Sequence, residues 1–240
     1  MLHWHAVNSY ADPVVPQLLA TYEESFPREV LVSPKVIVAL IEKGNCGDLG
    51  ADVFHIGAAL EDDVVVGGAV FIFLQRCNIG FINYIFVESG RRGRGVGGFI
   101  YHHLRSILER DAMALNKRQL EGIVFEVERE DSPTALGGPT ERIRRLRFFG
   151  RMGAVILEGL DYVQPPLHAG EDPLPMYLMF DPVGTCENLL SATRLLSWVE
   201  NIYRVVYIGG SGLEAEVVGV SLHRITESLR MGAVTLRHPH

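Results

Sequence analysis

The chain has 240 residues, of which 48% are hydrophobic and 21% are charged. This length and this balance are typical of a globular protein with one large domain, or one domain with an appendage. The formal net charge of −7 argues against nucleic acid or an anionic membrane as the main partner, because both would repel an acidic chain.

The three cysteines, Cys46, Cys77 and Cys186, are scattered and form no Cys-x-x-Cys pair. This pattern predicts neither a disulfide framework nor a zinc site. The N-terminus lacks a basic segment followed by an apolar run, and the longest apolar stretch, residues 64–74, is too short to cross a bilayer. We therefore expect a cytoplasmic protein with no metal ion and no membrane partner.

The first half of the chain combines helix-like and strand-like segments. Apolar residues at helical spacing predict helices over residues 14–26 and 35–43, the second closed by Gly44. Runs rich in β-branched residues predict strands over residues 2–7, 53–60, 64–74 and 80–87. Because short polar turns join the last three strands, we expect them to be consecutive and antiparallel.

A loop rich in glycine and arginine, residues 90–98, follows these strands and leads into a helix expected from Gly97 to about Ala114. Backbone N–H groups in such a loop can point at a phosphate, and the helix dipole favours negative charge there. Glycine lets a ligand approach the chain closely, and arginine adds charge-assisted hydrogen bonds. The segment predicts an anion-binding site, with a tight turn carrying solvated arginines as the alternative.

The second half of the chain continues the alternation. Strands are expected over residues 122–128, 154–157 and 176–180, with an arginine-rich helix over residues 140–152. Proline and glycine at residues 182–185 indicate a boundary, followed by an amphipathic helix over residues 186–206. Residues 214–230 fit either a helix or a strand, and the last three residues are expected to be frayed.

The loop sequence Arg92-Gly93-Arg94-Gly95-Val96-Gly97 resembles the Arg/Gln-x-x-Gly-x-Gly/Ala signature of the GCN5-related N-acetyltransferase (GNAT) superfamily. Residues 148–154 are similar to the family's late aromatic-x-x-x-Gly segment, and the order of elements matches over residues 2–180. The resemblance implies an α/β (α+β) fold with a mixed, mostly antiparallel twisted sheet flanked by helices. It makes residues 1–182 the acyltransferase core and residues 183–240 a helical C-terminal extension.

The resemblance also implies acetyl-CoA, or another acyl-CoA, as co-substrate. Its pyrophosphate would lie on the loop, its pantetheine would pair with the end of the preceding strand, and the strands 80–87 and 122–128 should diverge to admit it. The implied cofactor-binding residues are Phe86, Val87, Arg92, Gly93, Arg94, Gly95, Val96, Gly97 and Gly98.

A competing motif lies in the same loop, because Gly93-x-Gly95-x-x-Gly98 also satisfies the dinucleotide-binding fingerprint. That fingerprint needs a parallel βαβ unit with an acidic residue about 20 residues later. Here the loop follows hairpin-like strands, and Glu126 and Glu128 come too late in the chain. A Walker-type phosphate site is excluded because no Gly-Lys-Ser/Thr follows.

Acyl transfer to an amine needs a base for the amine proton, a donor to the oxyanion and an acid for the leaving thiolate. Many family members place a glutamate on the fourth strand and a tyrosine at the late aromatic position. At these places the chain has Asn83, which can orient a water but cannot take a proton, and Phe149, which has no proton to give.

Two glutamates on the next strand, Glu126 and Glu128, are the substitute candidates for the base or for a carboxylate that anchors the amine. A salt-bridged or solvated carboxylate is the equally weighted alternative. Tyr84 is the nearest hydroxyl for the acid, although it also fits a tyrosine of the core. The catalytic candidates are therefore Glu126, Glu128, Asn83 and Tyr84.

Arg28 and Glu29 lie between the early helices, where the family shapes its acceptor pocket, so they are the substrate-binding candidates. The loop at residues 162–166 can cover the same pocket. His102 and His103 point to different sides of a helix and predict no metal pair. The arginine-rich helix fits a solvated face, with contact to the 3′-phosphate of CoA as the alternative.

These observations predict an N-acetyltransferase that moves an acetyl or acyl group from CoA to the amine of a small molecule or peptide, by direct attack in a ternary complex. Two alternatives stay open: a CoA-binding regulatory or structural protein without catalysis, and a dinucleotide-dependent oxidoreductase. The apolar side of the helix over residues 186–206 can serve a homodimer interface or pack on its own core.

Overall fold

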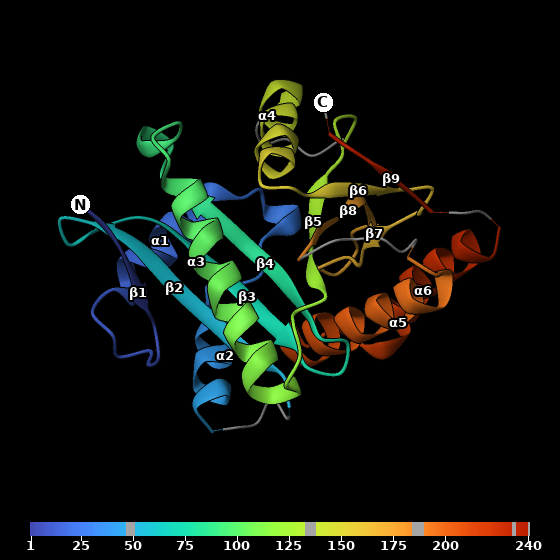
Figure 1. The fold of residues 1–240 in the computed structure, drawn as a ribbon, viewed down its shortest axis with the longest axis horizontal. Coiled ribbons are helices and arrows are strands. Elements are labelled where there is room, and N and C mark those ends of the chain that lie inside the picture. The colour runs from blue at the N-terminus through green and yellow to red at the C-terminus, as the bar shows by residue number, and fades with distance from the viewer. Residues whose placement is uncertain (47–50, 133–137, 184–189, 232–233, 240) are drawn as a thin grey trace. The chain divides into compact units, whose positions relative to one another are not determined.

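The computed structural model describes residues 1–46, 51–132, 138–183, 190–231 and 234–239 (Figure 1). The chain divides into two compact units, Met1–Leu120 and Glu121–His240. Within the described ranges, no helix combines the length and the apolar character that a membrane crossing requires.

The first unit is a four-stranded antiparallel sheet with helices on both faces. Its strands have the spatial order β1-β2-β3-β4 and run over Leu2–Ala6, Val53–Glu61, Val64–Leu74 and Ile79–Val87. Its helices are α1 (Val15–Ser25), α2 (Pro34–Cys46) and α3 (Val96–Asp111), with short helical turns η1 (Arg28–Val30), η2 (Ser89–Arg91) and η3 (Ala112–Asn116). The predicted run of three consecutive antiparallel strands is confirmed.

The hairpin between β2 and β3 turns through two aspartates. Asp62 and Asp63 have φ angles of 52° and 63°. Positive φ at both central residues is what a type I′ turn requires, and its twist matches the twist of the flanking strands. The turn thereby fixes the register in which Glu61 pairs with Val64.

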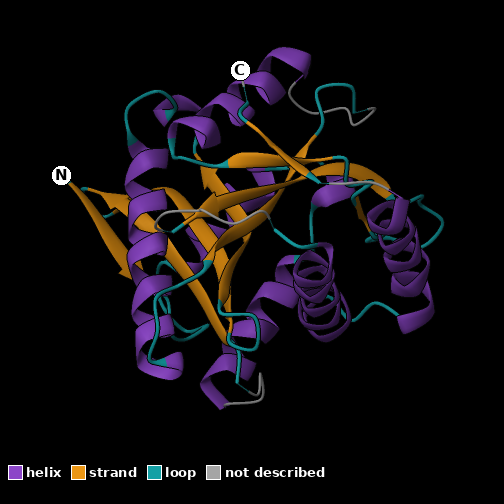
Figure 2. Cartoon of the chain, turned by 45° about the vertical axis from the view of Figure 1, so that its right-hand side comes forward, coloured by secondary structure: helices purple, strands orange, loops and turns teal. Residues whose placement is uncertain are grey.

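Two consecutive glycines in β3 let helices approach both faces of the sheet. A Cβ on Gly67 would lie 3.0 Å from Cδ1 of Ile100 in α3, and a Cβ on Gly68 would lie 2.5 Å from Cδ1 of Leu18 in α1. Because successive strand residues point to opposite faces, α3 covers one face and α1 the other (Figures 1 and 2). Because α3 packs closely on β3, the position of the loop that precedes this helix is fixed as well.

The apolar stripe of α3 explains why this helix lies flat on the sheet. Ile100, Leu104 and Leu108 recur every four residues, and all three are fully buried. On the opposite face, Leu18 and Tyr22 of α1 belong to a buried cluster that also contains side chains of α2 and the sheet. Each layer therefore buries an apolar face.

The second unit also combines antiparallel strands with helices. Its strands are β5 (Gly122–Glu128), β6 (Val155–Glu158), β7 (Val163–Gln164), β8 (Leu174–Pro182) and β9 (Thr235–Arg237), ordered β5-β8-β6-β9 with β7 paired to β8. Its helices are α4 (Gly138–Arg151), α5 (Ala192–Ile202) and α6 (Ala215–Met231), and the π-helical segment η4 (Tyr203–Gly210) continues α5. With the first unit, it confirms the expected α/β class and its mostly antiparallel strands.

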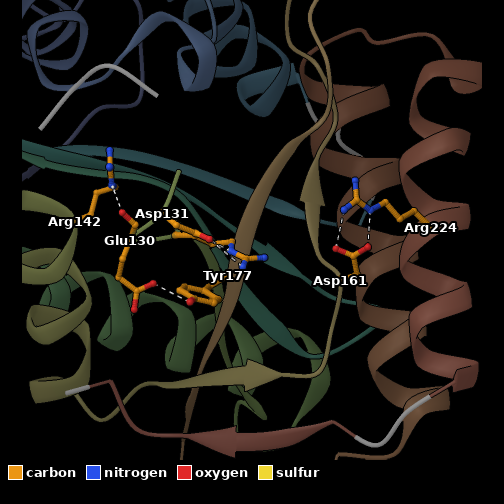
Figure 3. Close-up of polar contacts among 7 residues, drawn as sticks. Glu130, Asp131, Arg142, Asp161, Tyr177 and Arg224 are labelled. Carbon is orange, nitrogen blue, oxygen red and sulfur yellow. Dashed lines mark hydrogen bonds and ion pairs between the residues drawn. The ribbon is translucent and has the colours of Figure 1, made fainter. Parts of the chain in front are cut away.

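Aromatic contacts hold the helices of the second unit on its strands. Phe149 of α4 lies on Phe125 of β5 with ring centroids 4.3 Å apart, and Trp198 of α5 lies 5.3 Å from Phe180 of β8. The guanidinium of Arg224 in α6 also clamps Asp161, which precedes β7, through two contacts of 2.6 and 2.9 Å (Figure 3). Aromatic packing thus holds α4 and α5 on the strands, and a bidentate ion pair ties α6 to the residue before β7.

Several predicted boundaries differ from the structure. Helix α2 continues past Gly44 to Cys46. Helix α5 begins at Ala192 rather than at residue 186, because the Ser191 hydroxyl caps it by accepting from the Arg194 N–H at 3.2 Å. Residues 186–189 of that prediction lie outside the described ranges.

The C-terminal segment adds two elements. The undecided segment 214–230 is helix α6, and residues 235–237 of the tail form β9 against β6. The predicted boundary near residue 182 falls within the second compact unit and stays a prediction.

The arginine-rich helix α4 is not a wholly solvated face. Arg142 is 5% exposed, and its Nε donates to the backbone O of Glu130 at 3.2 Å (Figure 3). Arg144 pairs with Glu141 at 2.9 Å within the helix. Helical periodicity could not predict the burial of Arg142. A guanidinium can be buried when its donors find acceptors, and periodicity does not show where such acceptors lie.

Gly67→Ala should lower the free energy of unfolding by about 1–3 kcal/mol, because its Cβ would lie 2.5 Å from the backbone O of Phe86. Urea denaturation followed by circular dichroism measures the change. The matched control is Gly219→Ala in α6, whose Cβ meets no described atom within 4 Å and should raise stability by up to about 1 kcal/mol. Equal stability of Gly67→Ala and wild type would contradict this account of the sheet.

Candidate active site

The segment between β4 and α3 is an exposed glycine loop. After β4 ends at Val87, the η2 turn is closed by the Arg91 N–H, which donates to the backbone O of Glu88 at 2.9 Å. Gly93 and Gly95 then adopt φ angles of 77° and 84°, in the left-handed region that favours glycine. These two residues turn the chain from the strand into the first residue of α3.

Backbone N–H groups gather where this loop meets the helix. The Phe99 N–H donates to the backbone O of Gly95 at 3.0 Å, which is the first hydrogen bond of α3. The N–H groups of Val96, Gly97 and Gly98 precede it and have no acceptor within the helix. An anion placed there would gain both these donors and the helix dipole.

The glycine side of the loop is open to a ligand. A Cβ added to Gly93, Gly95 or Gly98 would meet no atom of the described chain within 4 Å. The stretch from Arg92 to Gly95 is exposed as well. The loop can therefore receive a phosphate without displacing a side chain, as the sequence predicted for an anion site.

The arginines of the loop have different surroundings. Arg91 pairs with Glu61 at 2.5 Å and lies 3.8 Å from Glu88, so it braces the loop against β2. Arg92 donates from Nε to the backbone O of Val87 at 3.4 Å. Arg94 lies on the exposed stretch between the two left-handed glycines, which makes it the side chain best placed to meet an anion.

The predicted pantetheine-binding residues lie at the end of β4. Phe86 is 4% exposed and packs against Tyr22 and Phe26, at ring distances of 5.8 and 6.2 Å. Phe86 and Val87 pair in register with the two glycines of β3. The side chain of Phe86 thus belongs to the core and that of Val87 is half-buried, so the main chain of these residues is the part suited to pair with an extended ligand.

Tyr84 ties β4 to the connection between α1 and α2. Its hydroxyl donates to the backbone O of Val30 at 2.8 Å and accepts from the Val32 N–H at 3.1 Å. Its ring lies 4.8 Å from Tyr22 and 5.0 Å from Phe26. These contacts fit the alternative in which Tyr84 is a tyrosine of the core. Its hydroxyl proton is already donated to the main chain.

The same connection carries the two predicted substrate-binding residues. Arg28 and Glu29 form part of η1, which ends at the residue whose carbonyl accepts from Tyr84. Arg28 is exposed and Glu29 is half-buried. The structure thus brings these residues beside a tethered loop of the first unit, where their side chains can meet a solute.

Asn83 carries a buried acceptor. Its Oδ1 is shielded from solvent and has no hydrogen-bond partner among the described residues. A buried carbonyl oxygen left without a donor costs free energy, so a water or a ligand N–H at this place would be favoured. This is consistent with the predicted role of Asn83 in orienting a water.

Glu126 of β5 has a carboxylate surrounded by phenols. The hydroxyl of Tyr162 donates to Oε1 at 2.5 Å, and the hydroxyl of Tyr207 lies 2.6 Å from both oxygens. Burial raises the pKa of the Glu126 carboxyl to about 7, against the lowering effect of the two tyrosine hydrogen bonds. A carboxyl that titrates near neutral pH can both take and release a proton under working conditions.

Glu128 has a different environment, although it lies only two residues further along β5. Its side chain is 2% exposed and pairs with Nη1 of Arg145 in α4 at 2.6 Å. This contact fits the salt-bridged alternative foreseen for one of the two carboxylates. The structure thus distinguishes a phenol-bound Glu126 from an arginine-bound Glu128.

The histidine pair on α3 shows no metal site. His102 is exposed, whereas Nδ1 of His103 lies 2.9 Å from the backbone O of Phe99 and its ring is stacked 6.0 Å from Trp4. In the described ranges, no group of three histidine, cysteine or acidic residues could hold a metal ion.

A strand, an open glycine loop and a helix N-terminus thus follow one another in an α/β protein, an arrangement that suits an anionic ligand. Residues 16–121, which contain this whole arrangement, match the family described as "Acetyltransferase (GNAT) family". This segment of the chain is therefore similar to the GNAT acetyltransferases. No curated protein sequence matches the chain significantly.

Solved structures share the fold. A GNAT-family protein from Bacteroides thetaiotaomicron has a TM-score of 0.61 at 22% identity, covering 85% of this chain and 98% of its own. The ribosomal-protein-S18-alanine N-acetyltransferase from Escherichia coli has a TM-score of 0.50 at 14% identity, covering 79% and 99%. A protein from Salmonella typhimurium, solved with its cofactor acetyl-CoA, has a TM-score of 0.50 at 13% identity, covering 78% and 96%.

Two partners of Glu126 escaped the sequence analysis. Tyr162 was singled out only as the start of a covering loop, and Tyr207 was not singled out at all. They lie 36 and 81 residues from Glu126 in the chain. An apolar segment that contains a tyrosine gives no signal of which carboxylate its hydroxyl will meet.

Glu126 should make stability fall as pH rises. Its pKa is about 7 in the folded protein against about 4.5 for a free carboxyl, so between these values the folded chain holds a proton that the unfolded chain has released. Over about 2.5 pH units, at about 1.4 kcal/mol each, wild type should lose on the order of 3 kcal/mol that Glu126→Gln does not lose. Chemical denaturation at about pH 4.5 and pH 8 measures the difference.

The control for this measurement is Glu24→Gln, which changes an exposed carboxylate on α1. It should keep the same pH dependence of stability as wild type. If Glu126→Gln also kept it, the carboxyl of Glu126 would not titrate near neutrality.

Proposed function

We propose that the protein transfers an acetyl group from acetyl-CoA to the amine of a small molecule or peptide. The observation that carries the proposal is the open loop before α3, with the N–H groups of Val96 to Gly98 at a helix N-terminus, inside the segment that matches the acetyltransferase family. The acetyl-CoA in the Salmonella typhimurium structure of the same fold agrees with this choice of co-substrate.

The residues of the loop fit the diphosphate of CoA. The main chain from Arg92 to Gly98 would supply N–H donors, and the guanidinium of Arg94 would add a charge-assisted hydrogen bond. The main chain of Phe86 and Val87 would pair with the pantetheine arm. When bound, the thioester supplies an activated acyl carbon.

Glu126 is the proposed general base. The amine nitrogen forms a bond to the acyl carbon, the carbon–sulfur bond breaks, and its electron pair stays on the sulfur. The proton lost by the nitrogen passes to the Glu126 carboxylate, whose pKa near 7 suits it to accept a proton from an amine. Asn83 would orient a water or the amine through its buried Oδ1.

The other candidate residues have contacts that bear on their proposed roles. The hydroxyl of Tyr84 is engaged with main chain, which favours a role in holding the acceptor loop over a role as acid. Arg28 and Glu29 of that loop stay the proposed acceptor contacts. The ion pair of Glu128 with Arg145 favours a structural role. Residues 183–240 are proposed as an extension of the family core.

The two other functions receive less support. A CoA-binding protein without catalysis would have no use for a carboxyl poised near neutral pH, so Glu126 favours the enzyme. A dinucleotide fingerprint opens a parallel βαβ unit, whereas β2, β3 and β4, which precede the loop, are antiparallel.

Acetyl-CoA should bind the protein and raise its melting temperature, and Arg94→Ala should weaken this binding by about tenfold, because a charged hydrogen bond contributes about 1.5–3 kcal/mol before solvent screening. Isothermal titration at two salt concentrations measures the effect. Arg110→Ala, at the other end of α3, is the control that should bind like wild type. Tighter binding of NADPH than of acetyl-CoA would instead support the oxidoreductase.

Glu126→Gln should reduce turnover by about 10²–10⁴-fold while leaving the affinity for acetyl-CoA intact, because only proton transfer is lost. Thiol release from acetyl-CoA in the presence of an amine library gives the rate. Glu128→Gln is the comparison, and at equal folded fraction it should keep most of the rate. Full turnover in Glu126→Gln would remove Glu126 as the base.

A further inference from the structure

The carboxylate of Glu126 is held by two segments that come later in the chain. Tyr162 reaches it from the connection between β6 and β7, and Tyr207 reaches it from η4. Both segments lie beyond residues 16–121, which match the family, and Tyr207 lies in residues 183–240, the proposed extension. The extension therefore contributes directly to the surroundings of the proposed base.

The position of Tyr207 depends on a local change of helix type. In η4 the Ser211 N–H donates to the backbone O of Val206 at 2.9 Å, five residues back, as in a π-helix. The wider turn changes the direction in which each following side chain points, and such turns are frequent at functional sites. Here the hydroxyl of Tyr207 points at Glu126 and lies 2.6 Å from both carboxylate oxygens.

Tyr203 anchors the same segment without touching the carboxylate. Its hydroxyl donates to the backbone O of Val163 in β7. Its ring lies 5.3 Å from Tyr207 and 6.1 Å from Tyr162. The cluster thus contains two phenols that bind Glu126 and one buried phenol that does not, which supplies an internal control.

We propose that Tyr207 is a positioning residue of the extension, which fixes the carboxylate of Glu126 and favours its ionised, proton-accepting form. This inference rests on the proposed function, in which Glu126 is the base. Both phenols donate stronger hydrogen bonds to the ionised carboxylate than to the protonated carboxyl, because a charged oxygen is the better acceptor. Loss of one donor therefore stabilises the protonated form.

The other groups around Glu126 carry little net charge, so the hydrogen bond from Tyr207 should have a measurable effect on its ionisation. Opposite Glu126 on β8 stands the apolar Leu178. Asp161 precedes Tyr162 in the chain and forms an ion pair with Arg224 of α6, drawn in Figure 3. The two opposite charges of this pair largely cancel. The phenols of Tyr162 and Tyr203 are kept neutral because burial raises the pKa of each.

The test compares Tyr207→Phe with Tyr203→Phe. In Tyr207→Phe the acidic limb of the pH profile of kcat/KM should move to higher pH by about one unit, because a hydrogen bond to a charged group contributes about 1.5–3 kcal/mol and one pH unit corresponds to about 1.4 kcal/mol. Tyr203→Phe, which loses its bond to the Val163 main chain and its contact with Tyr162 but no bond to Glu126, should move the limb much less. Tyr162→Phe should move it in the same direction as Tyr207→Phe.

A second readout does not need activity. Carbon-13 NMR of protein labelled at the glutamate carboxyl, with Glu126→Gln to assign the signal, follows the titration of Glu126 directly. A titration shifted upward in Tyr207→Phe by clearly more than in Tyr203→Phe supports the proposal. An unshifted titration in Tyr207→Phe, with circular dichroism showing a folded chain, overturns it.

The two readouts also separate this inference from the proposed function. If wild type transferred no acetyl group but the NMR shift appeared in Tyr207→Phe, the enzyme assignment and the role of Glu126 as base would fall while the control of its ionisation would stand. If wild type were active and the NMR titration did not move, the role of Tyr207 would fall alone.

Discussion

The N–H groups at the start of α3 impose the constraint on which the first unit depends. The amides of Val96, Gly97 and Gly98 cannot bond within their own helix, and an unpaired amide hydrogen is tolerated only where solvent or a ligand can reach it. The two left-handed glycines before the helix keep this end open. This backbone geometry, inside the segment that matches the acetyltransferase family, supports the proposal that the loop binds the diphosphate of CoA.

The sheet explains why the loop has a fixed place. Gly67 and Gly68 remove side chains from both faces of β3, so α3 and α1 can lie close on opposite sides. The buried stripe of α3 then prevents this helix from sliding along the sheet. Tyr84, near the same end of β4, ties down the connection that carries Arg28 and Glu29.

The surroundings of Glu126 differ from those of the glycine loop in their electrostatics. The loop exposes donors to an incoming charge, whereas β5 withdraws a charge from water and surrounds it with phenols. Desolvation outweighs the hydrogen bonds of Tyr162 and Tyr207, which is why the pKa of the carboxyl rises to about 7 rather than falls. Glu128, by contrast, is buried with its carboxylate 2.6 Å from the guanidinium of Arg145, so a positive charge rather than a phenol accompanies it.

The sequence by itself determined the strands and the loop of the first unit, the strand that carries Glu126 and Glu128, and the resemblance of residues 16–121 to an acetyltransferase family. These features depend on short-range patterns: alternation, helical spacing, and glycines beside arginines. It did not determine the start of α5, the nature of the segment that became α6, or the pairing of β9 with β6. Only the tertiary structure decided which carboxylate meets phenols and which meets an arginine, because hydrogen bonds across 36 to 81 residues of chain leave no periodic trace in the sequence.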